Sequence, residues 1–135
     1  MRTTAPLGFI LLLACGTSLQ SGAELQGVRL GVAPASVAAG GTVVLTLTNG
    51  SAEAVGYNLC TGTLERREGD DWRPIPSDRV CTMELRTLEP GRQDTFRLQL
   101  PAGITAGEYR FRTAVELPTP GERRDVASEQ FRVRG

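Results

Sequence analysis

The feature that most constrains this chain is a succession of short runs, after residue 27, in which apolar and polar residues alternate. Successive side chains of a β-strand point to opposite faces, so alternation predicts strands with one buried face. In "TVVLTLTNGS", for example, Val43, Leu45 and Leu47 share one face and threonines share the other. No run after residue 27 carries a convincing helical period. The chain therefore has to bury strands against strands.

The same pattern recurs along the rest of the chain and is interrupted by turn residues. Cys81 to Leu85 alternates, "GEYRFRTAVEL" (107–117) alternates, and "VASEQFRV" (126–133) closes the chain with Phe131 and Val133 on one face. Turn signals are Asn49-Gly50, Gly69-Asp70-Asp71, Pro90-Gly91 and the loop 118–125. Seven to eight short strands with turns every eight to twelve residues predict an all-β, antiparallel β-sandwich.

Missing residue types narrow the chemistry. The 135 residues include no His and no Lys, and 15 Arg balance 15 Asp and Glu. Without His there is no imidazole base, and without Lys there is no Schiff base or phosphate-loop lysine. A chain with zero net charge lacks the surplus of cations that non-specific nucleic-acid binding requires. We expect no catalytic residues, no cofactor, no metal site and no nucleic-acid partner, although a mechanism based on carboxylates alone stays open.

The beginning of the chain is typical of an export signal. Arg2 precedes an apolar run from Leu7 to Ala14, which is too short to span a bilayer and suits the core of a signal peptide. The run ends in Leu12-Leu13-Ala14-Cys15, which resembles the bacterial lipobox. The resemblance implies that diacylglycerol is attached to Cys15 and that the chain is cleaved before it. The predicted partner of this end is the membrane.

Ordinary signal-peptidase cleavage after Ala23 is the alternative, because Ser21-Gly22-Ala23 offers small residues at the needed positions. Both interpretations predict export, and the lipobox pattern favours a membrane-anchored protein of the cell envelope over a secreted one. The predicted division is a lipoprotein signal peptide at 1–14, a flexible tether at 15–27 and the folded domain at 28–135.

Cys60 and Cys81 enclose about twenty residues in a chain with an export signal, and exported proteins form lasting disulfides. Two cysteines without His are too few ligands for a zinc site, and a redox pair usually has the spacing Cys-x-x-Cys. We predict a structural disulfide between them; free thiols, and metal or redox use, are the less favoured alternatives.

Four stretches together resemble a family of bacterial immunoglobulin-like domains found in exported proteins and lipoproteins. They are "TLTNGSAEAVGYN", "LERREGDDWRPIP", "LEPGRQDTFRLQLP" and "AGEYRFRTAV", and the resemblance covers residues 28 to 133. It implies an immunoglobulin-like β-sandwich and supplies no catalytic residues. The "L-x-PG" turn and the strand order also resemble, more distantly, a bacterial intracellular proteinase inhibitor with an immunoglobulin-like fold.

The stretch from Tyr57 to Leu85 carries the candidate interaction residues Trp72, Arg66 and Arg67. In the family's pattern Trp72 packs across a hairpin, against the stems of Arg66 or Arg73 and near the disulfide. The other interpretation is a partly exposed Trp at a binding edge, where Trp is enriched. Pro74 and Pro76 cannot donate to a ladder, so this hairpin should form an edge of its sheet.

Charged pairs in the predicted hairpins have two interpretations. Arg66-Arg67 and Arg123-Arg124 are candidates for contacts to anionic headgroups or carboxylates, or are solvated and neutralised by neighbouring acids. Those acids are Glu65, Glu68, Glu122 and Asp125. Asp70-Asp71 lacks the ligand spacing of a calcium loop and suits a turn.

Three functions remain open at this point. The first is a non-enzymatic cell-envelope lipoprotein whose immunoglobulin-like domain serves as a protein-interaction or structural spacer module. The second is a proteinase inhibitor that presents the loop closed by Cys60 and Cys81. The third is an enzyme, which the absence of His, Lys and any nucleophile motif argues against. The sequence does not identify the protein partner.

Overall fold

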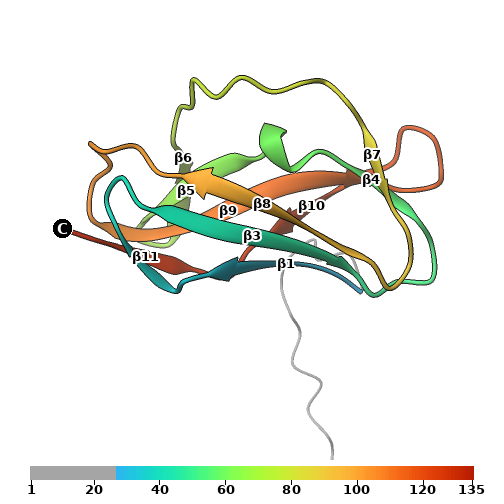
Figure 1. Cartoon of the computed structure of the whole chain (residues 1–135), viewed down its shortest axis with the longest axis horizontal. Helices are drawn as coiled ribbons and strands as arrows, with labels where there is room; N and C mark the ends of the chain where they lie inside the picture. The colour runs from blue at the N-terminus through green and yellow to red at the C-terminus, as the bar shows by residue number, and fades with distance from the viewer. Residues whose placement is uncertain (1–26) are drawn as a thin grey trace, which may run out of the picture.

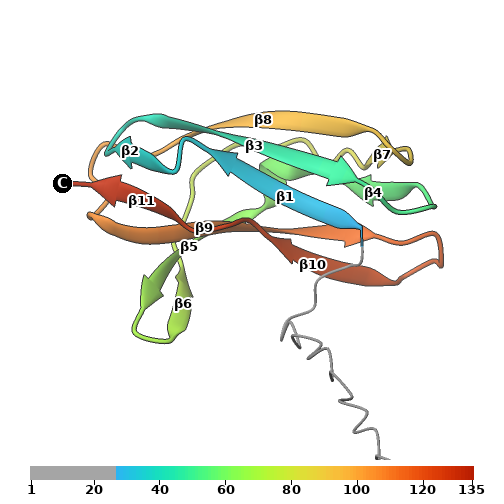
Figure 2. The same ribbon diagram turned by 90° about the horizontal axis from the view of Figure 1, so that it is seen from below.

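The computed structural model describes residues 27–135, which form a sandwich of two β-sheets (Figures 1 and 2). The signal peptide, Cys15 and nearly all of the predicted tether lie outside these residues. The strands are β1 (Val28–Ala33), β2 (Ser36–Ala38), β3 (Thr42–Asn49), β4 (Val55–Tyr57), β5 (Thr63–Glu68), β6 (Asp71–Pro74), β7 (Arg86–Leu88), β8 (Gln93–Gln99), β9 (Gly107–Glu116), β10 (Arg123–Ala127) and β11 (Phe131–Arg134). A short 3-10 helix, η1 (Leu59–Thr61), lies between β4 and β5.

The smaller sheet has the order β1-β3-β8, and the larger one has the order β2-β11-β9-β4-β7. In the larger sheet β10 and β5 also pair with β9, and β6 pairs with β5. Figure 2 shows the two sheets as layers, with the β5–β6 hairpin projecting beyond them. Neighbouring strands are antiparallel except β2 and β11, which run parallel. The predicted all-β, immunoglobulin-like sandwich is confirmed.

The core lies between the layers and is built by the alternation seen in the sequence. Val43, Leu45 and Leu47 of β3 are fully buried, and on β9 the buried positions are Tyr109, Phe111, Thr113 and Val115. The predicted inward faces of β3 and β9 are therefore confirmed. No helix within residues 27–135 has the length and apolar character needed to cross a bilayer.

Within residues 27–135 the structure has eleven strands, several of them only three or four residues long, where the sequence indicated seven to eight. The run 126–133 contributes to two strands, because β10 ends at Ala127 and β11 begins at Phe131. Ser128 lies at this interruption, where its N–H donates to the Phe111 carbonyl and its hydroxyl accepts from the Phe111 N–H. A further short strand, β2, forms soon after Pro34.

The turn signal at Asn49-Gly50 lies where β3 ends and the chain leaves the smaller sheet. Asn49 ends β3 and is fully buried, and the chain then crosses to β4 in the other sheet. The Asn49 amide donates to the carbonyls of Glu53 and Leu88 at 2.8 and 2.9 Å, and its oxygen accepts from Ser51. The bond from Ser51 to the Asn49 oxygen makes the local turn, and the bond from the Asn49 amide to Leu88 holds that turn against β7.

The predicted strand from Cys81 to Leu85 is absent. Residues 75–85, between β6 and β7, contain no strand, and the chain enters the sheet only at β7. Val80 and Met83 are 95% and 90% exposed. Alternation of apolar residues was misleading here, because neither face of the segment is covered.

Candidate functional site

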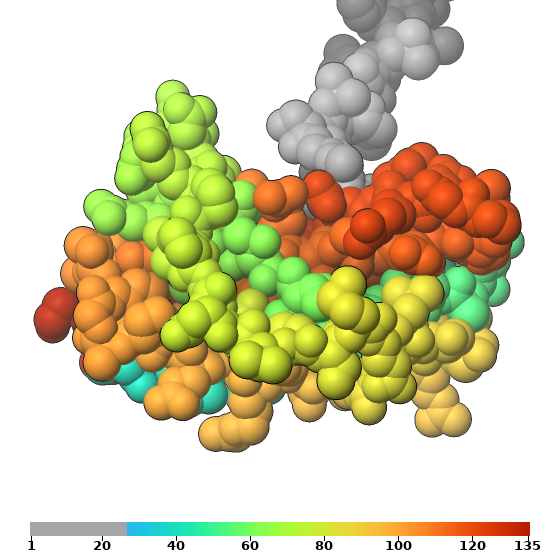
Figure 3. Space-filling view, turned by 90° about the horizontal axis from the view of Figure 1, so that it is seen from above, coloured from blue at the N-terminus to red at the C-terminus, as the bar shows by residue number. Residues whose placement is uncertain are grey.

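Residues 75–85, called the strap below, form the most unusual surface of the described chain. Three large apolar side chains within residues 27–135 are classed as exposed, Val80, Met83 and Leu85, and all three lie on the strap. Figure 3 shows the strap, in yellow-green and yellow, running across one side of the molecule. Solvent-exposed apolar side chains gathered in one segment are typical of a protein contact surface.

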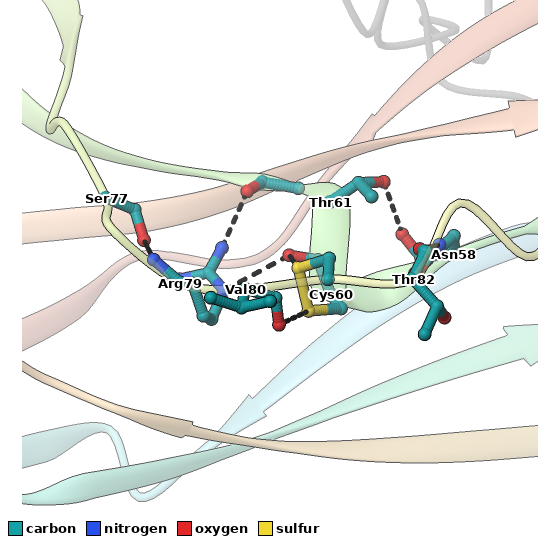
Figure 4. Close-up of a disulfide and its surroundings, with 9 residues drawn as sticks. Asn58, Cys60, Thr61, Ser77, Arg79, Val80 and Thr82 are labelled. Atoms are coloured by element: carbon teal, nitrogen blue, oxygen red, sulfur yellow. Dashed lines mark hydrogen bonds between the residues drawn. A yellow bond between two sulfur atoms is a disulfide. The ribbon is translucent and has the colours of Figure 1, made fainter.

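A disulfide fixes the strap near its middle. Cys60 of η1 and Cys81 of the strap are bonded, with 5.7 Å between their Cα atoms (Figure 4). The predicted pairing is present in the structure. In the chain-entropy model a loop of this length contributes about 3 kcal/mol to the free energy of unfolding. The strap therefore has a defined position although it belongs to no sheet.

Two side chains add to this anchor from either side of the disulfide. The Arg79 guanidinium donates to the carbonyls of Cys60 and Gly62 at 3.1 and 2.9 Å, and the Asn58 amide donates to the Thr82 carbonyl at 2.7 Å (Figure 4). Burial lowers the pKa of Arg79 from its ordinary value. Because Arg79 and Cys81 point toward η1, Val80 between them points into solvent.

The seat of the strap depends on a glycine. A Cβ at Gly62 would lie 2.3 Å from the Phe111 ring, so no larger residue fits there without moving that core side chain. The close approach brings the end of η1 down onto the core, and Arg79 lies over the same ring at 5.7 Å from its centroid. The position of the strap is thus set by the central strand β9.

Hollows flank the strap on both sides. One of about 540 Å³ lies between the strap and the segment 60–63, and Met83 forms part of its wall. Two more, of about 390 and 210 Å³, lie between the strap region and β8. The strap therefore carries exposed apolar side chains and has a hollow on each side. Its exposed part from Val80 to Glu84 is called the crest below, and it offers a surface that a protein partner can contact.

Tyr57 lines the smallest of these hollows and joins the two sheets. Its hydroxyl donates to Asp94 Oδ2 at 2.5 Å, which links β4 to β8. Burial raises the pKa of Tyr57 to about 12, and the Asp94 carboxylate adds to the shift. Tyr57 thus remains protonated at neutral pH, and the link between sheets persists there.

Of the candidate interaction residues, Trp72 and Arg67 share one face of the β5–β6 hairpin and Arg66 lies on the other. Trp72 pairs in register with Arg67, and Arg66 pairs with Arg73, so Arg66 lies on the opposite face of the hairpin from Trp72. Trp72 does not pack against the stems of Arg66 or Arg73 as expected. Its ring lies over the Arg110 guanidinium of β9, at 4.4 Å from the centroid.

Glu65 lies beside Arg110 and does not neutralise Arg66-Arg67 as the sequence suggested. It is 4% exposed and pairs with Arg110 at 2.8 Å and Arg112 at 3.4 Å, not with Arg66 and Arg67. Arg112 also pairs with Asp125 at 3.0 Å. Glu65, Arg110, Arg112 and Asp125 thus neutralise one another, whereas Arg67 on the same face donates, within residues 27–135, only to the Gly69 carbonyl and to the Gln130 side chain.

The other charged stretches also have local partners. Arg124 pairs with Glu122 at 2.6 Å, as expected, whereas Arg123 lies 3.9 Å from Glu116 of β9. Gly69 has a φ of 62° and turns the chain from β5 into β6. Within residues 27–135, no group of three or more His, Cys, Asp or Glu side chains is arranged to hold a metal ion. Trp72, Arg66 and Arg67 stay predictions as binding residues.

The exposed apolar crest of the strap was missed from the sequence. The alternation from Cys81 to Leu85 indicates a strand, and a strand would not leave Met83 in solvent on an uncovered segment. The available signal was the run Pro74-Ile75-Pro76-Ser77-Asp78, which disfavours continued ladder pairing. A strand that begins soon after such a run has little sheet left to join.

Comparison with known proteins agrees with this architecture. A bacterial Ig-like domain family matches residues 24–130, and no curated protein matches the chain. Among solved structures, a β-glucosidase from Listeria innocua in complex with gluconolactone aligns at 16% identity with a TM-score of 0.31. That alignment covers 79% of this chain and 16% of the glucosidase. Domains of the matched family are generally non-catalytic and typical of exported proteins. The chain belongs to the bacterial Ig-like domain family.

Proposed function

We propose that this protein is a non-enzymatic cell-envelope lipoprotein that binds another protein through the strap. The observation that carries the proposal is the display of Val80 and Met83, which are 95% and 90% exposed beside a disulfide. Leaving large apolar side chains in water gives no benefit to folding, whereas a partner that covers them gains their transfer free energy. Because the strap is held in place, little conformational entropy is lost on binding.

The arrangement of the fold suits a tethered module. Figure 1 shows the strap on the opposite side of the sandwich from β1, where the described chain begins. If Cys15 carries the lipid, the domain is attached through the residues that lead into β1. The strap then faces away from its attachment point and is accessible to proteins in the envelope.

Site-specific photocrosslinking in the producing bacterium tests the strap. A photoreactive amino acid at Val80 should yield one dominant adduct, and the same amino acid at Trp72 should yield none. Both positions lie within the stretch from Tyr57 to Leu85, and the Trp72 variant is the matched control. Adducts at Trp72 but not at Val80 would transfer the binding surface to the hairpin, and adducts at neither position would overturn protein binding by this stretch.

Lipid attachment has its own test. Labelled palmitate fed to the bacterium should be incorporated into the protein, and Cys15→Ser should abolish the label. An unlabelled product that begins after Ala23 would instead establish ordinary cleavage and secretion. This result is independent of the crosslinking, so the anchor and the binding surface can fail separately.

A proteinase inhibitor is the second candidate, and the strap favours it in one respect. Val80 is extended from the surface between Arg79, which is bonded to η1, and the disulfide at Cys81. A rigid, exposed segment of this kind can occupy a proteinase cleft without being released after cleavage. We expect inhibition of a serine proteinase with a small apolar specificity pocket, and Val80→Asp should abolish it. No inhibition across a panel of proteinases at micromolar protein would eliminate this candidate.

A further inference from the structure

The free edge of β8 carries a second inference, which is independent of the strap. β8 pairs with β3 only, and the other side of this strand has no strand beside it within residues 27–135. The N–H of Leu100 donates to Gly41, and the N–H of Asn49 donates to the carbonyl of Arg92, in the same register as the ladder. Even-numbered residues of β8 therefore bond toward β3, and odd-numbered residues direct their main-chain groups outward.

Most of these outward groups have no partner in the described part of the chain. The residues concerned are Gln93, Thr95, Arg97 and Gln99. The Thr95 N–H bonds to the carboxylate of Asp94 at 2.9 Å. No hydrogen bond joins residues 75–85 to β8, because the strap is held by the larger sheet and by η1. The strap lies beside this edge without pairing with it.

Most other edges of the described sandwich are short or blocked, and the five-residue edge strand β10 carries the charges of Arg123, Arg124 and Asp125. β6 ends at Pro74, β2 and β7 have three residues each, and β1 makes a bridge from Leu30 to Ser128. Natural proteins protect long edges with proline, lysine, bulges or covering segments, because an open edge pairs readily with another strand. β8 contains no proline, and Arg97 is the only charge among its outward-facing side chains.

We propose that β8 pairs antiparallel with β8 of a second copy of this chain, so that two three-stranded sheets join into one. A second β8 supplies an extended strand of the same length, with polar side chains on the outer face and apolar ones toward the core. When the two-fold axis passes near Thr95 or Phe96, Arg97 faces Gln93 or Thr95 of the other copy and not another Arg. Zero net charge also leaves no long-range repulsion between copies. Two-fold dimers of this kind are the commonest assemblies.

Sedimentation equilibrium of the full chain from micromolar to millimolar concentration measures the association. We expect a monomer–dimer equilibrium. Arg97→Pro removes an outward N–H from each of the two copies, so the dimer loses two hydrogen bonds of about 1 kcal/mol each. The dimer dissociation constant should therefore rise about tenfold or more. The comparison variant is Thr46→Pro on β3, an internal strand of the same sheet. Its free energy of unfolding shows the cost of a proline that breaks a hydrogen bond within the sheet, and Arg97→Pro should cost much less.

Cysteine scanning decides the question even if the proline variants do not fold. Single Cys substitutions at Gln93, Thr95, Arg97 and Gln99, in the full chain with Cys15→Ser, should form disulfide dimers most readily near the two-fold axis. The maximum is at Thr95 if the axis passes near Thr95, and is shared by Thr95 and Arg97 if it passes near Phe96. Thr46→Cys and Thr48→Cys on the same face of β3 are the controls. A monomer at every concentration, or equal crosslinking at all positions and controls, overturns the proposal. The strap variants leave these main-chain groups untouched, so failure of one proposal does not imply failure of the other.

Discussion

The stretch from Tyr57 to Leu85 contains two regions that are held in opposite ways. The hairpin of β5 and β6 holds the residues that draw attention in the sequence, among them Trp72 and Glu65, and these bind neighbours within the domain. The strap holds ordinary apolar residues, and Val80 and Met83 lie in solvent. The conspicuous residues are thus structural partners, and the inconspicuous ones form the open surface.

The difference follows from how each region is held. In the hairpin, β5 is fixed by ladder hydrogen bonds to β9, and β6 is fixed by β5. The side chains of Trp72 and Glu65 are therefore not needed to hold the main chain and contact Arg110 of β9. The strap is fixed by one covalent bond, by the Arg79 side chain and by the Thr82 carbonyl, which accepts from Asn58. The side chains of Val80 and Met83 take no part in these bonds and stay outside. Because the strap has no ladder hydrogen bonds, the side chains that do not bind η1 are left exposed to solvent.

The largest effect on this comparison should come from removing the disulfide. Cys60→Ser with Cys81→Ser should lower the free energy of unfolding by about 3 kcal/mol. It should also open the strap to limited proteolysis while the β5–β6 hairpin stays protected, since only the strap depends on the bond. Urea denaturation and mapping of cleavage sites measure both effects. Cleavage in the hairpin first would show that the two regions are not held separately.

A smaller effect is expected from Glu65→Ala. Removing this buried carboxylate leaves Arg110 and Arg112 without their shared partner and should cost about 2 kcal/mol. Glu84→Ala on the strap is the matched control, because Glu84 is exposed and should be neutral within about 0.5 kcal/mol. Denaturant midpoints of the two variants give the comparison. Equal losses would contradict the assignment of the charged cluster to stability.

The contact of Trp72 with Arg110 should be worth less again. A double-mutant cycle with Trp72→Leu and Arg110→Met should give a coupling free energy of about 0.5–1 kcal/mol, the range of a partly exposed cation–π pair. The coupling is read from urea denaturation of the four proteins. A coupling near zero would free Trp72 for the binding role that the sequence indicated.

The smallest effect on stability is expected at the crest of the strap. Met83→Ser should change the free energy of unfolding by less than about 0.5 kcal/mol, because the side chain is almost as exposed as in the unfolded chain. Leu64→Ala in β5 provides the contrast, with a loss of about 2–5 kcal/mol for a buried leucine. A destabilisation at Met83 close to that at Leu64 would mean that the strap is part of the core.

The sequence was sufficient for the sandwich and for the faces of its long strands. In β3 and β9 the period of two coincides with real burial, so alternation identified Val43, Leu45 and Phe111 correctly. It failed at Met83 because the same alternation arises in an uncovered segment. Asn49 combines both cases, since its turn bond to Ser51 is local and was indicated by the sequence, whereas its bond to Leu88 depends on the tertiary structure.

Of the candidate site, only the disulfide could be predicted from the sequence. The pairing of Cys60 with Cys81 follows from export and cysteine number, and the structure contains it. The partner of Glu65 did not follow, because Arg110 lies 45 residues away and meets it only through the pairing of β5 with β9. Contacts between distant strands require the register, which a single sequence does not provide.

The glycine at position 62 gives the strap an engineering use. Because Gly62 seats η1 on Phe111, the anchor of the strap is built from the core and from main-chain carbonyls, not from the side chains at the crest. Residues 80, 83 and 84 can therefore be varied together while Arg79 and Cys81 are kept. The domain is in this sense a display scaffold, in which a small library of crest sequences could be selected for new binding specificities on an unchanged sandwich.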